Sequence, residues 1–291
     1  MTDEEKGLGL GFVGVAIFAL TLPLTRYALS DFDPLFLAIG RTVVAAVIAA
    51  PLLIATRQQR PTFADLRLLA FVIAGVVFGF PILSAIASQS VSASHGGVVL
   101  GALPLATALM STCFSGERPS LRFWAFGILG SILVIAYALG EHNVELHAGD
   151  ALLVLAVIAA SMGYAAGGQL AKRLGGWQVI CWALVIALPL SLPLTLWQVS
   201  KLTGHETLPS WLCFLYLALM SQLAGFFFWN RGLAMGGIAR VGQVQLLQSS
   251  MTLVAASLIL GETITPRAVV FAVLIAACVW LGRRAAIRSL R

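Results

Sequence analysis

Ten apolar runs of about 20 residues follow one another along the 291-residue chain, separated by short charged or proline- and glycine-rich breaks. About 20 mostly apolar residues are what a helix needs to cross the hydrocarbon core of a bilayer. Charged residues make up 10% of the chain, against roughly a quarter in soluble domains. The sequence therefore predicts an all-α polytopic membrane protein with ten transmembrane helices. The expected spans are Leu8–Tyr27, Pro34–Thr56, Leu66–Ser88, His95–Phe114, Leu121–Leu139, Gly149–Ala171, Gly176–Val199, Ser210–Leu233, Ala239–Leu260 and Arg267–Ala285.

Positive charges lie almost entirely on one side of the predicted membrane. With the N-terminus in the cytoplasm, 14 Lys and Arg residues fall in cytoplasmic segments, while Arg26, Lys201 and Arg267 fall outside. This distribution follows the positive-inside rule and predicts that both termini are cytoplasmic. The net charge of +6 then reflects topology, and we expect no nucleic-acid partner. We interpret the first run as a retained helix rather than a signal peptide.

Part of the sequence recurs after 145 residues, in one helix, the turn after it and the start of the next helix. The recurring pairs are Gly97 and Gly242, Thr107 and Thr252, Gly116-Glu117 and Gly261-Glu262, and Arg122 and Arg267. An internal duplication leaves such a placement. Because each half holds five helices, an odd number, the second copy is expected to be inverted. We therefore expect two inverted five-helix repeats, residues 1–145 and 146–291, with a pocket between them at the midplane.

Small residues spaced four apart predict close helix contacts in several of the spans. The pairs are Gly75 and Gly79, Gly97 and Gly101, Gly163 and Gly167, and Gly232 and Gly236. We expect the helices that carry them to form a tight inner bundle.

Polar side chains inside the predicted helices are candidates for substrate contact, because a polar group in lipid needs a partner. The predicted substrate-binding residues are Thr21, Ser161, Tyr164, Ser221, Gln222, Gln245 and Ser249. The ninth helix is the most polar, and its amides and hydroxyls either line a cavity or hold two helices together; we favour the cavity. Pocket-shaping or hinge positions are expected at Pro23, Pro81, Gly101 and Pro104.

Arg41 falls well inside a predicted helix. An arginine at that depth is costly and is a functional candidate, here as a counter-charge for a substrate carboxylate. The alternative is an arginine that reaches the interface or caps helix-end carbonyls. All twelve carboxylates lie at helix ends or in loops. The protein is therefore either a facilitator or is coupled through another group, such as His95 near the outer mouth.

An intramembrane enzyme needs a nucleophile and a base, or a set of metal ligands, within its helices. No acidic residue or histidine lies deep enough in the predicted spans to supply one. The outer loop from Glu141 to His147 contains possible ligands but no tetrahedral spacing. We therefore expect no enzymatic activity, no metal site and no cofactor, and we interpret the four cysteines as free.

Several blocks of sequence point to a family. They are SASHGGVVLGALPL (92–105), GERPSL (116–121), PLFLAIGR (34–41), WNRGL (229–233) and ARVGQVQ (239–245). In this order they resemble the drug/metabolite transporter superfamily, EamA type, over nearly the whole chain. The resemblance implies a ten-helix inverted-repeat carrier whose cavity is walled mainly by the first, third, fourth, sixth, eighth and ninth helices. It also implies export of amino acids and related metabolites, with aromatic amino-acid exporters as one branch.

These features together predict an inner-membrane exporter of amino acids that works by alternating access. Apolar walls with a few amides and hydroxyls suit a neutral apolar or aromatic amino acid, and threonine and methionine are further candidates. A multidrug or other metabolite exporter is the alternative among transporters, and a membrane receptor or structural subunit is the alternative of another class. We expect a monomer in the bacterial cytoplasmic membrane, with the lipid bilayer and a small molecule as its partners.

Overall fold

The computed structural model describes residues 1–141, 148–264, 266–282 and 287–289, and these residues are mainly helical. The α-helices are α1 (Asp3–Ala19), α2 (Thr21–Ala28), α3 (Arg41–Ala55), α4 (Phe63–Val72), α5 (Phe80–Ala87), α6 (Ala93–Val99), α7 (Leu103–Phe114), α8 (Leu121–Glu141), α9 (Ala148–Leu174), α10 (Gly176–Val199), α11 (Leu208–Tyr216), α12 (Gly225–Gly236), α13 (Ile238–Gly242), α14 (Leu246–Leu260) and α15 (Pro266–Gly282). Short π-helices η1 (Phe36–Gly40), η2 (Ile73–Gly79) and η4 (Leu217–Ala224) and 3₁₀ turns η3 (Leu100–Ala102) and η5 (Gln243–Gln245) lie between some of them.

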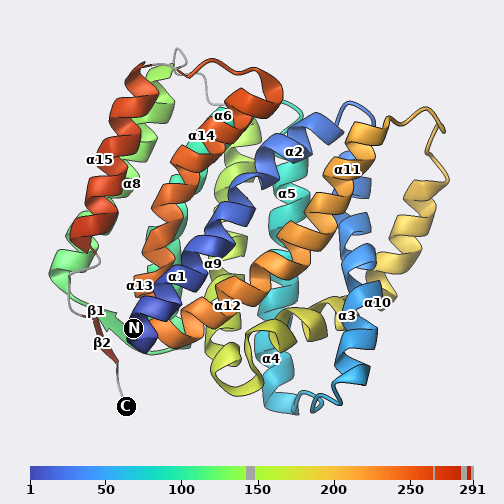
Figure 1. Cartoon of the computed structure of the whole chain (residues 1–291), viewed down its shortest axis with the longest axis horizontal. Coiled ribbons are helices and arrows are strands. Elements are labelled where there is room, and N and C mark those ends of the chain that lie inside the picture. The colour runs from blue at the N-terminus through green and yellow to red at the C-terminus, as the bar shows by residue number, and fades with distance from the viewer. Residues whose placement is uncertain (142–147, 265, 283–286, 290–291) are drawn as a thin grey trace.

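The predicted all-α polytopic architecture is confirmed. Over the described residues, each predicted run folds as one helix or as consecutive helical segments. We call each such continuous helical stretch a rod. Among the described residues, eight rods are long and apolar enough to cross a bilayer. They are Asp3–Ala28, Phe36–Ala55, Phe63–Ala87, Ala93–Phe114, Ala148–Leu174, Gly176–Val199, Leu208–Gly236 and Ile238–Leu260. The other two predicted spans correspond to α8 and α15, which pack against each other at one edge of the bundle (Figure 1); their crossing of the membrane stays a prediction.

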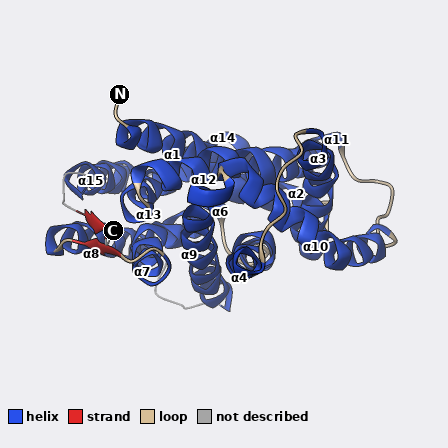
Figure 2. Cartoon of the chain, turned by 90° about the horizontal axis from the view of Figure 1, so that it is seen from below, coloured by secondary structure: helices blue, strands red, loops and turns tan. Residues whose placement is uncertain are grey.

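The helices form a flattened bundle when the chain is viewed from below, with α1, α14 and α11 on one side and α7, α9 and α4 on the other (Figure 2). At one end, β1 (Glu117–Pro119) pairs antiparallel with β2 (Ile287–Ser289). The sequence predicts a turn at residues 116–119 and no strand, so this pairing is a correction. A three-residue strand has no periodicity that a sequence pattern reveals, since its partner lies far along the chain.

Glycines let helices α1 and α12 cross with their backbones in contact. A Cβ added to Gly7 would lie 2.5 Å from the backbone nitrogen of Gly236, and one added to Gly232 would lie 2.8 Å from that of Gly11. Gly75 of η2 approaches Gly163 of α9 in the same way. The expected close packing of small residues is confirmed at these crossings, which set the spacing of the inner helices.

A single methyl group tests the α1–α12 crossing. We expect Gly7→Ala to lower the free energy of unfolding by about 1–3 kcal/mol, because the new Cβ meets backbone that is unable to rotate away. Gly9→Ala on the same helix is the matched control, since a Cβ there has no neighbour within 4 Å. Thermal unfolding in detergent compares the two, and equal melting temperatures would contradict the crossing.

Two carboxylates bind the start of a helix in the other half of the chain. The two helices concerned, α13 and α6, lie at opposite ends of the bundle (Figure 1). Glu117 is buried and accepts hydrogen bonds from the backbone N–H groups of Ile238 and Ala239, both at 2.8 Å, where α13 begins. Glu262 accepts hydrogen bonds from the backbone N–H and the hydroxyl of Ser94, where α6 begins. A carboxylate is favourable at both places because helix N-termini carry partial positive charge.

The contacts of the two halves are reciprocal. Glu117 and Glu262 are 145 residues apart, and so are their partners Ala239 and Ser94. The glycine–threonine pairs behave in the same way. A Cβ added to Gly97 would lie 2.8 Å from the Thr252 side chain, and one added to Gly242 would lie 3.2 Å from the Thr107 side chain. The recurring glutamates, glycines and threonines therefore make equivalent contacts with the other half of the chain.

We call the contact of Glu117 with the start of α13 and that of Glu262 with the start of α6 the two caps. Backbone hydrogen exchange tests the two caps separately. We expect Glu117→Gln to speed exchange at residues 238–241 roughly tenfold, because a charge-assisted hydrogen bond is replaced by a neutral one. Glu262→Gln is expected to act at residues 93–97 instead. Each variant is the control for the other. Equal changes at both ends in both variants would contradict two independent caps.

Candidate functional site

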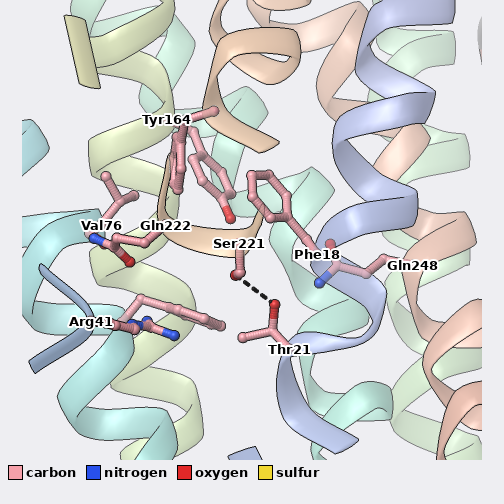
Figure 3. Close-up of a pocket in the computed structure, with 10 residues that line it drawn as sticks. Phe18, Thr21, Arg41, Val76, Tyr164, Ser221, Gln222 and Gln248 are labelled. Atoms are coloured by element: carbon pink, nitrogen blue, oxygen red, sulfur yellow. Dashed lines mark hydrogen bonds between the residues drawn. The ribbon is translucent and has the colours of Figure 1, made fainter. Parts of the chain in front are cut away.

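A small cavity lies at the centre of the bundle, where six of the membrane-crossing rods meet. Its wall consists of Phe18, Thr21, Arg41, Val76, Phe80, Tyr164, Ser221, Gln222, Phe226 and Gln248. Five of these side chains are polar, besides Arg41. Figure 3 shows Arg41 on the side of the cavity opposite Gln248, with Thr21, Ser221 and Tyr164 between them.

The polar part of the wall coincides with irregular helix geometry. Thr21 follows the break between α1 and α2, and Arg41 follows the π-helix η1. Ser221 and Gln222 lie within the π-helix η4. Helical irregularities of this kind are common at functional sites. Inside a bilayer they are tolerated only where the backbone is buried in protein or lines a cavity.

Pro23 explains the break in the first rod. Proline has no N–H, so Pro23 is unable to donate to the carbonyl of Ala19, four residues earlier. The hydroxyl of Thr252 on α14 donates to that carbonyl instead, at 2.9 Å. The hydroxyl of Thr21, on the next turn, bonds with that of Ser221 at 2.8 Å. Ala19 and Thr21 thus tie the first rod to two rods of the second half.

A second set of carbonyls is freed in the third rod. The N–H of Phe80 bonds to the carbonyl of Gly75, five residues earlier, so the carbonyl of Val76 loses its usual partner. The amide nitrogen of Gln222 donates to Val76 at 3.3 Å. Pro81 likewise leaves the carbonyl of Val77 without its helical donor. The Thr42 hydroxyl lies 3.5 Å from that oxygen, at the limit of a hydrogen bond.

Two buried polar atoms of the wall residues have no partner among the described residues: Nε of Arg41, a donor, and Oε1 of Gln248, an acceptor. Arg41 is only 4% exposed and makes no ion pair among the described residues. No carboxylate lines the cavity. The wall therefore carries one positive charge on one side and a hydrogen-bond acceptor on the other.

Aromatic rings form the apolar part of the wall. Phe18 stacks on Tyr164 with ring centroids 6.3 Å apart and contacts Phe226 at 5.0 Å. Behind them, the buried Trp229 packs edge-on against Tyr164 at 5.3 Å. These contacts build one aromatic cluster from three rods, beside the polar groups.

The free space in the cavity is small. About 20 Å³ is open to the centres of water molecules, which suffices for one or two waters. A larger molecule needs the surrounding helices to move apart. The cavity is therefore too small for an amino acid in this arrangement of the helices.

The structure brings together four of the seven predicted substrate-binding residues, Thr21, Tyr164, Ser221 and Gln222, and adds Arg41. Ser161 lies outside the wall and donates to the carbonyl of Ile158, one turn earlier in its own helix. His95 also lies outside it, where its Nε2 is 2.7 Å from the carboxylate of Asp150. Both roles predicted from the sequence, cavity contact and coupling, stay untested.

The ninth span turns a different face to the cavity from the one the sequence predicted. Gln245 accepts a hydrogen bond from Thr107 at 3.2 Å and so holds two helices together. Ser249 is buried outside the wall. Gln248 lines the cavity instead. Gln248 and Ser249 are neighbours in α14, and which of them faces the cavity depends on how α14 packs against the other helices, which a helical spacing rule does not give.

The helices that wall the cavity also differ from the expected set. The second rod contributes Arg41, whereas the fourth rod contributes no wall residue. Gly101 and Pro104 are buried in that fourth rod, in and just after its 3₁₀ turn η3, and Pro81 is buried beside the cavity residue Phe80. Their predicted hinge roles stay predictions. Residues 142–147, which hold the possible metal ligands of the outer loop, lie outside the described residues.

The chain as a whole is similar to known transporter proteins. The profile of the EamA-like transporter family matches residues 5–139 and again residues 147–282. The chain is 46% identical to the uncharacterized transporter YdeK of Bacillus subtilis (strain 168), over 98% of this chain and 99% of that protein. It is 27% identical to a probable terminal-alkyne amino-acid exporter of Streptantibioticus cattleyicolor, over 93% and 91%. A protein of known crystal structure shares the fold, with a TM-score of 0.76, 14% identity and coverage of 96% and 98%.

The contact between Thr252 and the carbonyl freed by Pro23 makes a quantitative prediction. We expect Thr252→Val to cost about 1–3 kcal/mol of stability, because it leaves a buried carbonyl without a donor. In a Pro23→Ala background residue 23 regains its N–H, so the same substitution is expected to cost about 1 kcal/mol less. Thermal unfolding of the four proteins measures this coupling. Additive effects would contradict it.

Proposed function

The chain belongs to the EamA-like transporter family, and from this premise we propose that it exports amino acids by alternating access through the central cavity. It is a multi-pass membrane protein, and its family is found in bacteria. The substrate class we propose is the neutral amino acids with an apolar or aromatic side chain. The relative that is named as a probable terminal-alkyne amino-acid exporter supports this class.

The observation that carries the proposal is the pair of unpartnered polar groups in the wall. Arg41 offers a positive charge and Gln248 an acceptor, on opposite sides of the cavity. A zwitterion matches both, with its carboxylate at the guanidinium and its ammonium group at the amide oxygen. Thr21 and Ser221 already bond to each other, so their hydroxyls have less capacity left for a ligand.

The aromatic cluster suits the side chain of such a substrate. Phe18, Tyr164 and Phe226 present apolar faces to the same space as the polar groups. Ring faces favour offset stacking or edge contacts with another aromatic group. Phenylalanine is therefore the first substrate to test, followed by methionine and threonine.

The small cavity and the reciprocal caps support alternating access. A cavity of about 20 Å³ does not admit an amino acid without helix movement. Glu117 joins the halves at one end and Glu262 joins them at the other. In the proposed cycle, residues 1–145 and 146–291 act as inverted repeats that rock against each other, so that one cap opens while the other stays closed. The cap at Glu117 is expected to face the cytoplasm, together with both termini, in a bacterial inner membrane.

The test asks whether Arg41 binds the carboxylate of the substrate. We expect Arg41→Gln to weaken phenylalanine binding at least about tenfold, because a charge-assisted hydrogen bond is lost from a buried site. The same variant is expected to leave binding of phenethylamine, which has no carboxylate, unchanged. Binding is measured by thermal stabilisation in detergent, and transport by efflux of radiolabelled phenylalanine from proteoliposomes.

Ser161→Ala is the matched control, since this hydroxyl is buried but lies outside the cavity wall. It is expected to transport like the unmodified protein. Unchanged phenylalanine efflux in Arg41→Gln would refute the proposed role of the arginine. Efflux of cationic drugs without efflux of any amino acid would favour a multidrug exporter instead.

A further inference from the structure

A second polar pocket lies away from the central cavity, at one end of the bundle. It is formed by the residues after α3, the C-terminal end of α9 and the first turns of α10, and about 250 Å³ of it is open to small molecules. Its wall includes Arg57, Arg173, Gln178 and Trp182. None of these residues takes part in the central cavity or in the caps that join the two halves.

Arg57 has a backbone conformation that glycine adopts more easily. Its φ is +51°, and Arg57 is the one non-glycine residue with a positive φ in the described chain. The N–H of Arg57 bonds to Ile54 and that of Gln58 to Leu53, which is the Schellman arrangement that ends helix α3. Glycine is the usual residue at this position. An arginine in this conformation lowers stability relative to a glycine, so we expect the Arg57 side chain to have a role.

Three residues that line the pocket have polar groups without a partner among the described residues. The guanidinium of Arg57 has no hydrogen bond or ion pair in the part of the chain that the structure describes. Nε1 of Trp182, a donor, and Oε1 of Gln178, an acceptor, are buried without a partner. The Gln178 amide is oriented by its nitrogen, which donates to Gln58 at 3.2 Å. The pocket therefore offers two donors and one acceptor.

The charge of the pocket favours a ligand with a single negative charge. Arg173 is paired with the carboxylate of Asp65, which is itself held by Thr62 at the start of α4. Arg57 is then the uncompensated charge of the wall. A phosphodiester carries one negative charge at neutral pH, whereas a phosphate monoester carries about 1.5 to 2. A phosphodiester with a neighbouring hydroxyl would satisfy the guanidinium, the indole N–H and the amide oxygen together.

An apolar stripe continues from the pocket along α10. Trp182, Ile186 and Leu190 are spaced four residues apart and so share a face. Ile186 and Leu190 are 40% and 60% exposed, on a rod that is long and apolar enough to span the membrane. A ligand whose head occupies the pocket can therefore lay an acyl chain along this stripe.

We propose that this pocket binds the headgroup of an anionic phospholipid with a free hydroxyl, of the phosphatidylglycerol type. The phosphodiester accepts hydrogen bonds from Arg57 and Trp182, and the glycerol hydroxyl donates to Gln178. Phosphatidylcholine has no donor for Gln178. Phosphatidylethanolamine brings an ammonium group close to Arg57, so both lipids bind less well.

The test uses Arg57→Gly, a variant that removes the guanidinium and suits the backbone conformation at this position. The full-length protein and the variant are mixed in detergent with dioleoyl phosphatidylglycerol, and lipid adducts of both are compared by native mass spectrometry. We expect the variant to bind the lipid at least about tenfold less, while it unfolds at the same or a higher temperature without lipid. Trp182→Phe, which removes one donor, is expected to weaken binding about fivefold.

Arg60→Gln is the matched control, because Arg60 is an exposed arginine in the same connection and does not line the pocket. It is expected to bind the lipid like the unmodified protein. Equal losses for Arg57→Gly and Arg60→Gln would refute the site in favour of a diffuse basic surface. Equal binding of phosphatidylcholine would refute the charge argument. Stabilisation by glycerol 3-phosphate as strong as by the lipid would show a soluble phosphate ligand and refute the lipid.

Discussion

Every backbone N–H and C=O group inside a bilayer must find a partner within the protein, and this constraint explains the centre of the structure. Prolines and π-helical turns free carbonyls there, and at least two of these carbonyls accept a hydrogen bond from a side chain of another rod. Thr252 takes the carbonyl that Pro23 leaves free, and Gln222 takes that of Val76. The irregular helices are stable because polar residues of distant segments complete them, so the same contacts that permit the breaks also join the rods.

Buried polar residues at the centre of the structure are of two kinds, those with hydrogen-bond partners and those without. Thr252 and Gln222 donate to carbonyls of other helices and hold those helices in place. Arg41 and Gln248 have buried atoms with nothing to bond to, and both line the cavity. An unpartnered buried group is costly. The second set therefore has the greater capacity to bind a ligand, which is why the proposed substrate contacts rest on it.

The reciprocal contacts show why some residues recur after 145 positions while most do not. Glu117 and Glu262 recur because each caps a helix of the other half, and the glycine–threonine pairs recur because each glycine makes room for the other half's threonine. The cavity wall follows no such rule. Arg41, for example, corresponds at this shift to Ile186, a half-exposed residue on α10. A substrate has no two-fold symmetry, so its site gains nothing from a repeated wall.

The sequence alone determined that the chain is an all-α membrane protein, where its rods lie and which glycines pack closely, because apolar length and small-residue spacing are local properties. It also indicated Thr21, Tyr164, Ser221, Gln222 and Arg41 as candidates, since polar groups in an apolar run are visible in the sequence. Only the tertiary structure decided that Gln248 rather than Gln245 or Ser249 faces the cavity. The physical reason is that helical spacing fixes only which residues share a face, whereas the face of α14 that meets the cavity depends on its packing against segments far away in the sequence.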